Sequence, residues 1–272
     1  MACDTLVMSA APSSPVARRR TFLAAAGLGA GAAVVAACSG DDTEEGASTD
    51  AGPVTTAADP AGEADTEALT PAMFEALAIC ALTPGSSGGP FPSREQLDRR
   101  DVTDGYPGHP LRLGVRVVDE GCRPVAGSQV EIWHTDATGD YSSFVDDGSG
   151  KDEGEGTTFM RGFQTSDADG LLEFQTIYPG WYGGRAVHIH VRARVDGAEV
   201  LTAQLYFDED YTESVFRTGE YERFGPPDTG WADDGLIGDP TVDGTGITLT
   251  EAPTSKGAGT LGLVNLGVPV AR

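Results

Sequence analysis

The sequence has little positive charge. Its 18 lysine and arginine residues stand against 42 aspartate and glutamate residues, which gives a formal net charge of −24 at pH 7. Lysine is the rarer of the two basic residues, since only Lys151 and Lys256 occur. Nucleic-acid binding needs clustered Lys and Arg to neutralise phosphates, so we expect no nucleic-acid partner. The acidity is more typical of a solubilising surface.

Long hydrophobic runs are also missing. The longest apolar stretch, within residues 18–38, is rich in Ala and Gly, and it is too short and weakly apolar to predict a membrane span. Basic residues precede it, as in an export signal. Residues 19–23, RRTFL, resemble the twin-arginine export motif, and residues 35–38, VAAC, resemble a bacterial lipobox.

These features predict three segments. Residues 1–37 are expected to be a signal peptide, and Cys38 to carry a lipid that anchors the protein to the outer face of the bacterial cell membrane. The alternative is an ordinary soluble N-terminal tail. Residues 38–67 are expected to be a lipidated, acidic and disordered tether, because residues 39–67 hold no aromatic, Ile, Leu or Met. Residues 68–272 are expected to form the folded domain.

Cysteine is scarce as well, with four residues in the chain. Cys3 would leave with the signal peptide and Cys38 would carry lipid, so Cys80 and Cys122 remain as one pair. In an exported protein such a pair favours a disulfide. Two free thiols are the alternative.

Short β-rich runs dominate the folded part. Residues 111–119 and 129–134 alternate apolar and polar side chains, and Gly, Pro, Asp and Ser clusters separate the runs. Only residues 71–80 are expected to form a short helix. The pattern predicts an all-β fold with little helix, an antiparallel, immunoglobulin-like β-sandwich of roughly seven or eight strands. The other expected strands cover residues 171–177, 187–195, 199–207, 246–251 and 262–270.

Two of the four histidines lie in one expected strand, in RAVHIHVRAR (185–194). Strand side chains alternate between faces, so His188 and His190 point the same way and Ile189 points the other way. Two imidazoles on one face, about 7 Å apart along the backbone, can converge on one metal ion. Without further ligands, two exposed or core histidines at chance spacing are the favoured interpretation.

Two tyrosines lie in loops next to these strands. Tyr182 is in PGWYGG, just before the strand that carries the histidines, and Tyr141 follows the strand that ends near Trp133. Phenolate oxygens together with imidazoles suit ferric iron better than zinc, which prefers thiolate and imidazole. Bound iron would require both phenols to be deprotonated.

Four motifs follow one another along the folded part. They are WHTDATGDY (133–141), RGFQTSDADG (161–170), TIYPGWYGGRAVHIH (176–190) and QLYF (204–207). In this order they resemble the intradiol ring-cleavage dioxygenases, and most of all the exported, single-domain members of that family. The similarity runs from about Cys80 to at least Phe207.

The resemblance implies a function and a set of site residues. Members of the family use Fe(III) and O₂ to open a catechol between its two hydroxyl-bearing carbons, which gives a cis,cis-muconate-type product. Tyr182 would act as a base, Arg185 would stabilise negative charge, and Gln204 would line the pocket. The resemblance does not fix an oligomeric state. The implied iron ligands are Tyr141, Tyr182, His188 and His190.

Other aromatic residues near the motifs are interpreted as structural. Tyr178 is expected to be structural or to line the pocket, and His134 to be structural or to support the site without binding metal. Trp133 and Trp181 are expected to form core or pocket wall. Two alternative functions use the same residues: a non-catalytic surface lipoprotein that binds a ligand or carbohydrate, and a zinc or copper site on the two histidines plus another ligand.

Overall fold

The computed structural model describes residues 67–77, 81–89, 97–143 and 156–270. The expected signal peptide, the lipidated Cys38 and nearly all of the tether lie outside the described residues. Cys80 does too. Cys122 is disulfide-bonded, and its pairing with Cys80 stays a prediction. None of the helices in the described ranges has the length and apolar character needed to cross a membrane.

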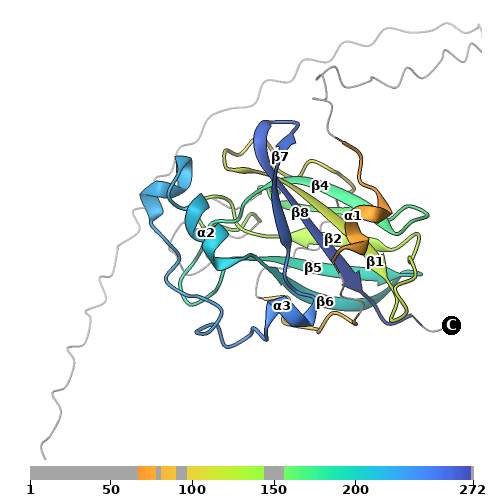
Figure 1. The fold of residues 1–272 in the computed structure, drawn as a ribbon. Helices are drawn as coiled ribbons and strands as arrows, with labels where there is room; N and C mark the ends of the chain where they lie inside the picture. The colour runs from red at the N-terminus through yellow and green to blue at the C-terminus, as the bar shows by residue number, and fades with distance from the viewer. Residues whose placement is uncertain (1–66, 78–80, 90–96, 144–155, 271–272) are drawn as a thin grey trace, which may run out of the picture. The chain divides into compact units, whose positions relative to one another are not determined.

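The folded part consists of two four-stranded sheets (Figure 1), and this confirms the predicted all-β sandwich. In the first sheet the strand order is β4-β1-β8-β7, and in the second it is β3-β2-β5-β6. The first sheet contains β1 (Pro110–Val118), β4 (Leu171–Ile177), β7 (Thr248–Thr254) and β8 (Gly257–Gly267). The second contains β2 (Gln129–Trp133), β3 (Arg161–Thr165), β5 (His188–Val195) and β6 (Ala198–Tyr206).

One strand pair departs from the antiparallel pattern. Strands β1 and β8 are parallel, with Leu111 opposite Thr260. Parallel pairing needs a long crossover connection, and the six strands that lie between β1 and β8 in the sequence provide one. The other pairs in both sheets are antiparallel.

Strand β5 separates the hydrophobic core from a polar face. Ile189, Val191 and Ala193 are fully buried in the core between the sheets. His188 and His190 therefore lie on the opposite, outer face of the second sheet. Across the strands His188 is opposite Tyr206, and His190 is opposite both Gln204 and Trp133. The outer face thus gathers the imidazoles with polar and aromatic side chains from β2 and β6.

The helices are short. The predicted helix within residues 71–80 is present as α1 (Pro71–Glu75). Three further helices and β3 were not predicted, because elements of four to seven residues are too short to show a clear hydrophobic period. The three helices are α2 (Glu209–Val215), the 3₁₀ helix η1 (Gly219–Phe224) and α3 (Pro240–Asp243). Asp208 caps α2 by accepting a hydrogen bond from the backbone N–H of Tyr211.

The position of Ile189 gives a test of this arrangement. Because its side chain is fully buried, Ile189→Ala should lower the free energy of unfolding by about 2–5 kcal/mol, and the matched variant Ile189→Val by about 0.5–1.5 kcal/mol. Urea unfolding of both variants, followed by circular dichroism, measures the two losses. Equal and small losses would mean that Ile189 does not face the core.

Candidate metal centre

The two histidines of β5 bring their Nε2 atoms together. These atoms are 3.2 Å apart, and the side chains are almost fully buried, with His188 3% and His190 1% exposed. The Tyr182 hydroxyl oxygen is 3.2 Å from the same Nε2 atom of His188. Three atoms that can bind a metal therefore converge on one point of the outer face of the sheet.

The hydrogen bond of His188 fixes its tautomer. Its Nδ1 atom is 2.7 Å from the carbonyl oxygen of Ala186. A carbonyl only accepts hydrogen bonds, so Nδ1 carries the proton and donates it. In the neutral ring, Nε2 is then unprotonated and presents its lone pair to the point where the donor atoms converge. This is the arrangement that a metal-binding histidine needs.

Both imidazoles are held neutral. Burial, assisted by the positive charge of Arg185, lowers the pKa of His188 to about 4. Burial also lowers the pKa of His190 to about 2, with smaller effects from His188 and Arg185. Metals bind the unprotonated ring, so at neutral pH neither histidine must lose a proton before it binds one.

His190 is packed on two sides. The Trp133 indole stacks on its ring, with centroids 5.0 Å apart and planes within 1° of parallel. The Arg192 guanidinium lies over the same indole, 5.1 Å from its centroid. Near the imidazole lies Gly89, where a Cβ atom would come within 3.1 Å of the His190 Cε1 atom. These contacts hold the ring in one orientation.

Two glycines place the tyrosine-bearing segments side by side. A Cβ atom on Gly180 would lie 2.5 Å from the backbone nitrogen of Gly139, and one on Gly139 would collide with the Trp181 carbonyl oxygen. Only glycine allows this approach, because it has no Cβ. As a result the Tyr141 and Tyr182 rings lie 5.8 Å apart between centroids. The Tyr141 ring is also 6.1 Å from that of His190.

The two phenols are protonated at neutral pH in the metal-free protein. Burial raises the pKa of Tyr141 well above its usual value, and the neighbouring Tyr182 raises it further. Burial also raises the pKa of Tyr182. Deprotonating two buried phenols side by side requires a strong positive charge between them. Ferric iron supplies such a charge and prefers anionic oxygen ligands, so the four side chains fit this ion.

The zinc or copper alternative has less support. It needs a further ligand beside the histidine pair. In the described ranges, no group of three or more His, Cys, Asp or Glu side chains is close enough together to hold a metal. The side chains that do accompany the histidines are phenols.

Arg185 and Gln204 lie beside the histidines and contact each other. The Arg185 guanidinium donates a hydrogen bond to the Gln204 side-chain oxygen through Nη2. The Tyr206 hydroxyl donates to the same oxygen at 2.7 Å, and the Gln204 amide donates to the Ser87 carbonyl at 2.8 Å. Gln204 is thus held in one orientation, with Arg185 next to it.

Several residues of the site were missed by sequence reasoning. Asp234 accepts a hydrogen bond from Arg185 Nε at 2.9 Å. Tyr206 lies within the QLYF motif, but no role was predicted for it from the sequence. Arg161 opens a motif and reaches Ser142, the neighbour of Tyr141, with a 2.7 Å bond from Nε to the hydroxyl oxygen. Only the motifs around Tyr206 and Arg161 could have revealed them, and no pattern in the sequence marks Asp234.

His134 and Tyr178 lie in structural positions. Both ring nitrogens of His134 are engaged, Nδ1 with the Thr135 carbonyl at 2.7 Å and Nε2 with the Thr176 hydroxyl at 2.8 Å. No lone pair is free to bind a metal. The Tyr178 hydroxyl is 2.7 Å from the Thr212 hydroxyl within the core. Neither side chain joins the four that converge.

Comparison with known proteins gives matches to dioxygenases. A family model described as "Dioxygenase" matches residues 88–216. Catechol 1,2-dioxygenase 2 of Acinetobacter lwoffii is 30% identical over 166 residues, 54% of this chain and 54% of that protein. The protocatechuate 3,4-dioxygenase beta chain of Burkholderia cepacia is 34% identical over 130 residues, 44% of this chain and 54% of that protein. The chain spans about half the length of these curated relatives.

The fold also matches a solved structure. An intradiol ring-cleavage dioxygenase from Tetranychus urticae superimposes with a TM-score of 0.63 at 28% identity. The match covers 71% of this chain and 97% of that one. The similarity in fold therefore extends over nearly the whole of that protein.

The buried His134 predicts a pH dependence of stability. Burial lowers its pKa to about 3 in the folded protein, whereas an unfolded histidine titrates near 6.5. Between these values the unfolded state binds one more proton, so falling pH favours unfolding by about 1.4 kcal/mol per pH unit. In the metal-free protein, His134→Gln should reduce this slope between pH 6 and pH 5.

Urea unfolding at several pH values measures the slope. Tyr178→Phe is the matched control, because it also loses a buried hydrogen bond but no group that titrates in this range. It should lower stability and leave the slope unchanged. If His134→Gln leaves the slope as in the wild type, His134 does not titrate as a buried neutral ring.

Proposed function

This chain belongs to the intradiol ring-cleavage dioxygenase family, and from this premise we propose that it is a ferric-iron enzyme acting on catechol-type aromatic diols. With O₂ it would cleave the bond between the two hydroxyl-bearing carbons and give a cis,cis-muconate-type product. One observation carries the proposal: the Nε2 atom of His188 is 3.2 Å from the Nε2 atom of His190 and 3.2 Å from the Tyr182 hydroxyl oxygen.

The ligand set divides into neutral and anionic donors. His188 and His190 supply two neutral nitrogens, and Tyr141 and Tyr182 supply two phenolate oxygens once deprotonated. When bound, ferric iron would lower the pKa of the substrate's hydroxyl groups and so favour binding of the ionised diol. Once Tyr182 has taken up a proton, the Tyr141 phenolate and the doubly ionised substrate would together balance the charge of the ion.

Tyr182 is the proposed base. It is half-buried and more exposed than Tyr141, so its side chain has more room to move. The loop backbone is tied down, because the Trp181 indole donates to the Gly225 carbonyl and the Gly184 N–H to Asp228. Tyr182 would therefore take a proton of the substrate onto its phenolate oxygen by rotating its side chain, without movement of the whole loop.

Arg185 is the proposed electrostatic group. Its side chain is 16% exposed, and its guanidinium donates to Gln204, which lies opposite His190 across β5 and β6. A cation held there would stabilise negative charge that develops on the aromatic ring. Gln204, fixed by three hydrogen bonds, would form the wall behind it.

Substitutions along RAVHIH separate binding from chemistry. His188→Ala should lose iron, because it removes a preorganised neutral donor. Arg185→Ala should keep iron and visible colour, but its catechol-dependent O₂ uptake should fall by about 10²–10³, the scale for one charge-stabilising donor. Iron content and O₂ uptake are measured on the same preparations.

Each outcome bears on a different part of the proposal. If Arg185→Ala loses iron while His188→Ala stays fully metallated and active, the roles assigned to Arg185 and His188 are wrong. A wild-type protein that holds iron but consumes no O₂ with any substituted catechol would favour a non-catalytic ligand-binding protein. Zinc or no metal in well-folded wild type would exclude the ferric site.

The proposed location is the outer face of the bacterial cell membrane, with a lipid at Cys38. The RRTFL and VAAC stretches, which lie outside the described residues, support it. Replacing both Arg19 and Arg20 with lysine should abolish export, and Cys38→Ala should prevent lipid attachment. Radiolabelled palmitate and cell fractionation measure both effects. Equal labelling of Cys38→Ala and wild type would contradict lipidation at Cys38.

A further inference from the structure

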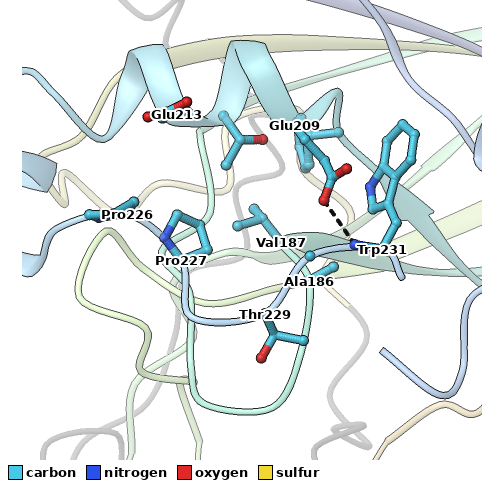
Figure 2. A pocket seen from close by; sticks show the side chains of 11 residues that line it. Ala186, Val187, Glu209, Glu213, Pro226, Pro227, Thr229 and Trp231 are labelled. Carbon is cyan, nitrogen blue, oxygen red and sulfur yellow. Dashed lines mark hydrogen bonds between the residues drawn. The ribbon is translucent and has the colours of Figure 1, made fainter. Parts of the chain in front are cut away.

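A loop that follows η1 supports the site from outside the matched region. We call residues 225–236 the brace loop. The family model ends at residue 216, so the loop lies beyond it. Figure 2 shows Pro226, Pro227, Thr229 and Trp231 of this loop facing Ala186 and Val187. These residues line a pocket of about 190 Å³. Glu209 of α2 anchors the loop by accepting a hydrogen bond of 2.9 Å from the backbone N–H of Trp231.

Asp234 is the innermost residue of the brace loop. It is 3% exposed, and its carboxylate has three donors. Oδ2 accepts hydrogen bonds from Arg185 Nε at 2.9 Å and from the backbone N–H of Ala186 at 3.0 Å. Oδ1 accepts from the backbone N–H of Leu236 at 3.0 Å. A carboxylate so buried requires these partners, since one left unpaired would be costly.

The same carboxylate reaches two functional side chains. It holds the Arg185 guanidinium directly, between itself and Gln204. It also holds the N–H of Ala186, and the carbonyl of the same residue, in the next peptide group, accepts the Nδ1 proton of His188. Groups that orient a metal-binding histidine or an active-site cation in this way change affinity or activity by about 10–100-fold when they are removed.

We propose that Asp234 is a positioning residue for the reaction, which sets the orientation of Arg185 and, through the backbone of Ala186, that of His188. The proposal rests on the proposed function. It gives the brace loop a role in the chemistry through Arg185 and His188.

Asp234→Asn tests this with little change of shape. An amide has one oxygen, so in either orientation its NH₂ group faces a donor, Leu236 on one side or Arg185 and Ala186 on the other. We expect kcat to fall about 10–100-fold. The matched control is Asp228→Asn, the same change in the same loop. This carboxylate is exposed, and one oxygen, Oδ1, accepts both of its bonds, from the Gly184 N–H at 3.3 Å and the Thr229 hydroxyl at 2.7 Å, so the single oxygen of Asn can replace it. Asp228→Asn should leave kcat unchanged.

A double-mutant cycle shows whether Asp234 acts through Arg185. In an Arg185→Ala background, Asp234→Asn should lower kcat much less than it does in the wild type, because its main target is gone. If Asp234→Asn lowers kcat by the same factor in the Arg185→Ala background as in the wild type, Asp234 does not act through Arg185. A Tm lowered equally by Asp234→Asn and Asp228→Asn, with kcat unchanged in both, would reduce Asp234 to a structural residue.

One readout does not depend on activity. In the metal-free protein, ¹⁵N NMR of the imidazoles should show His188 protonated at Nδ1 alone, and a mixture of tautomers in Asp234→Asn. An unchanged His188 signal would overturn the role of the Ala186 backbone, even if the wild type proved to have no dioxygenase activity. Failure of the proposed function and failure of this inference are therefore distinguishable.

A second variant covers the case in which Asp234→Asn does not fold. Arg185→Lys keeps the positive charge but has no Nε–H and no planar fork to join Asp234 and Gln204. If position matters as well as charge, its kcat should fall at least 10-fold. A kcat equal to that of the wild type would overturn the proposal.

Discussion

The site depends on the alternation of side chains along β5. Ile189 and Val191 fill the core between the sheets, and this burial fixes the face to which His188 and His190 point. A shift of the strand by one residue would bury the imidazoles in the core and expose Ile189. The hydrophobic core thus sets the register of the metal-binding pair, and neighbouring strands supply Trp133 and Gln204 opposite His190.

Loops complete what the strand begins. The close approach of Gly139 and Gly180 brings the two tyrosines together from segments about 40 residues apart, and the brace loop ties down the chain between Tyr182 and His188. A rigid sheet with ligands added from loops is a common way to build a site. Here burial keeps the imidazoles neutral and the phenols protonated, so only a strongly charged cation would ionise the tyrosines.

Much of the fold and of the candidate site could be predicted from the sequence. Period-two alternation gave seven of the eight strands and the common face of His188 and His190, and motif order gave Tyr141 and Tyr182. What escaped depends on distant contacts. The parallel pairing of β1 with β8 and the bond from Asp234 to Arg185 join segments far apart in the chain, and neither leaves a local pattern. Strand β3 is only five residues long, and its RGFQT sequence does not alternate clearly.

The central claim is that Tyr141, Tyr182, His188 and His190 bind one ferric ion. A crystal structure of the iron-loaded protein, with anomalous diffraction recorded at the iron absorption edge, tests it most directly. The account predicts one strong anomalous peak about 2 Å from the Nε2 atoms of both histidines and within bonding distance of both tyrosine oxygens. No peak among these side chains, or one bound by other residues, would contradict it.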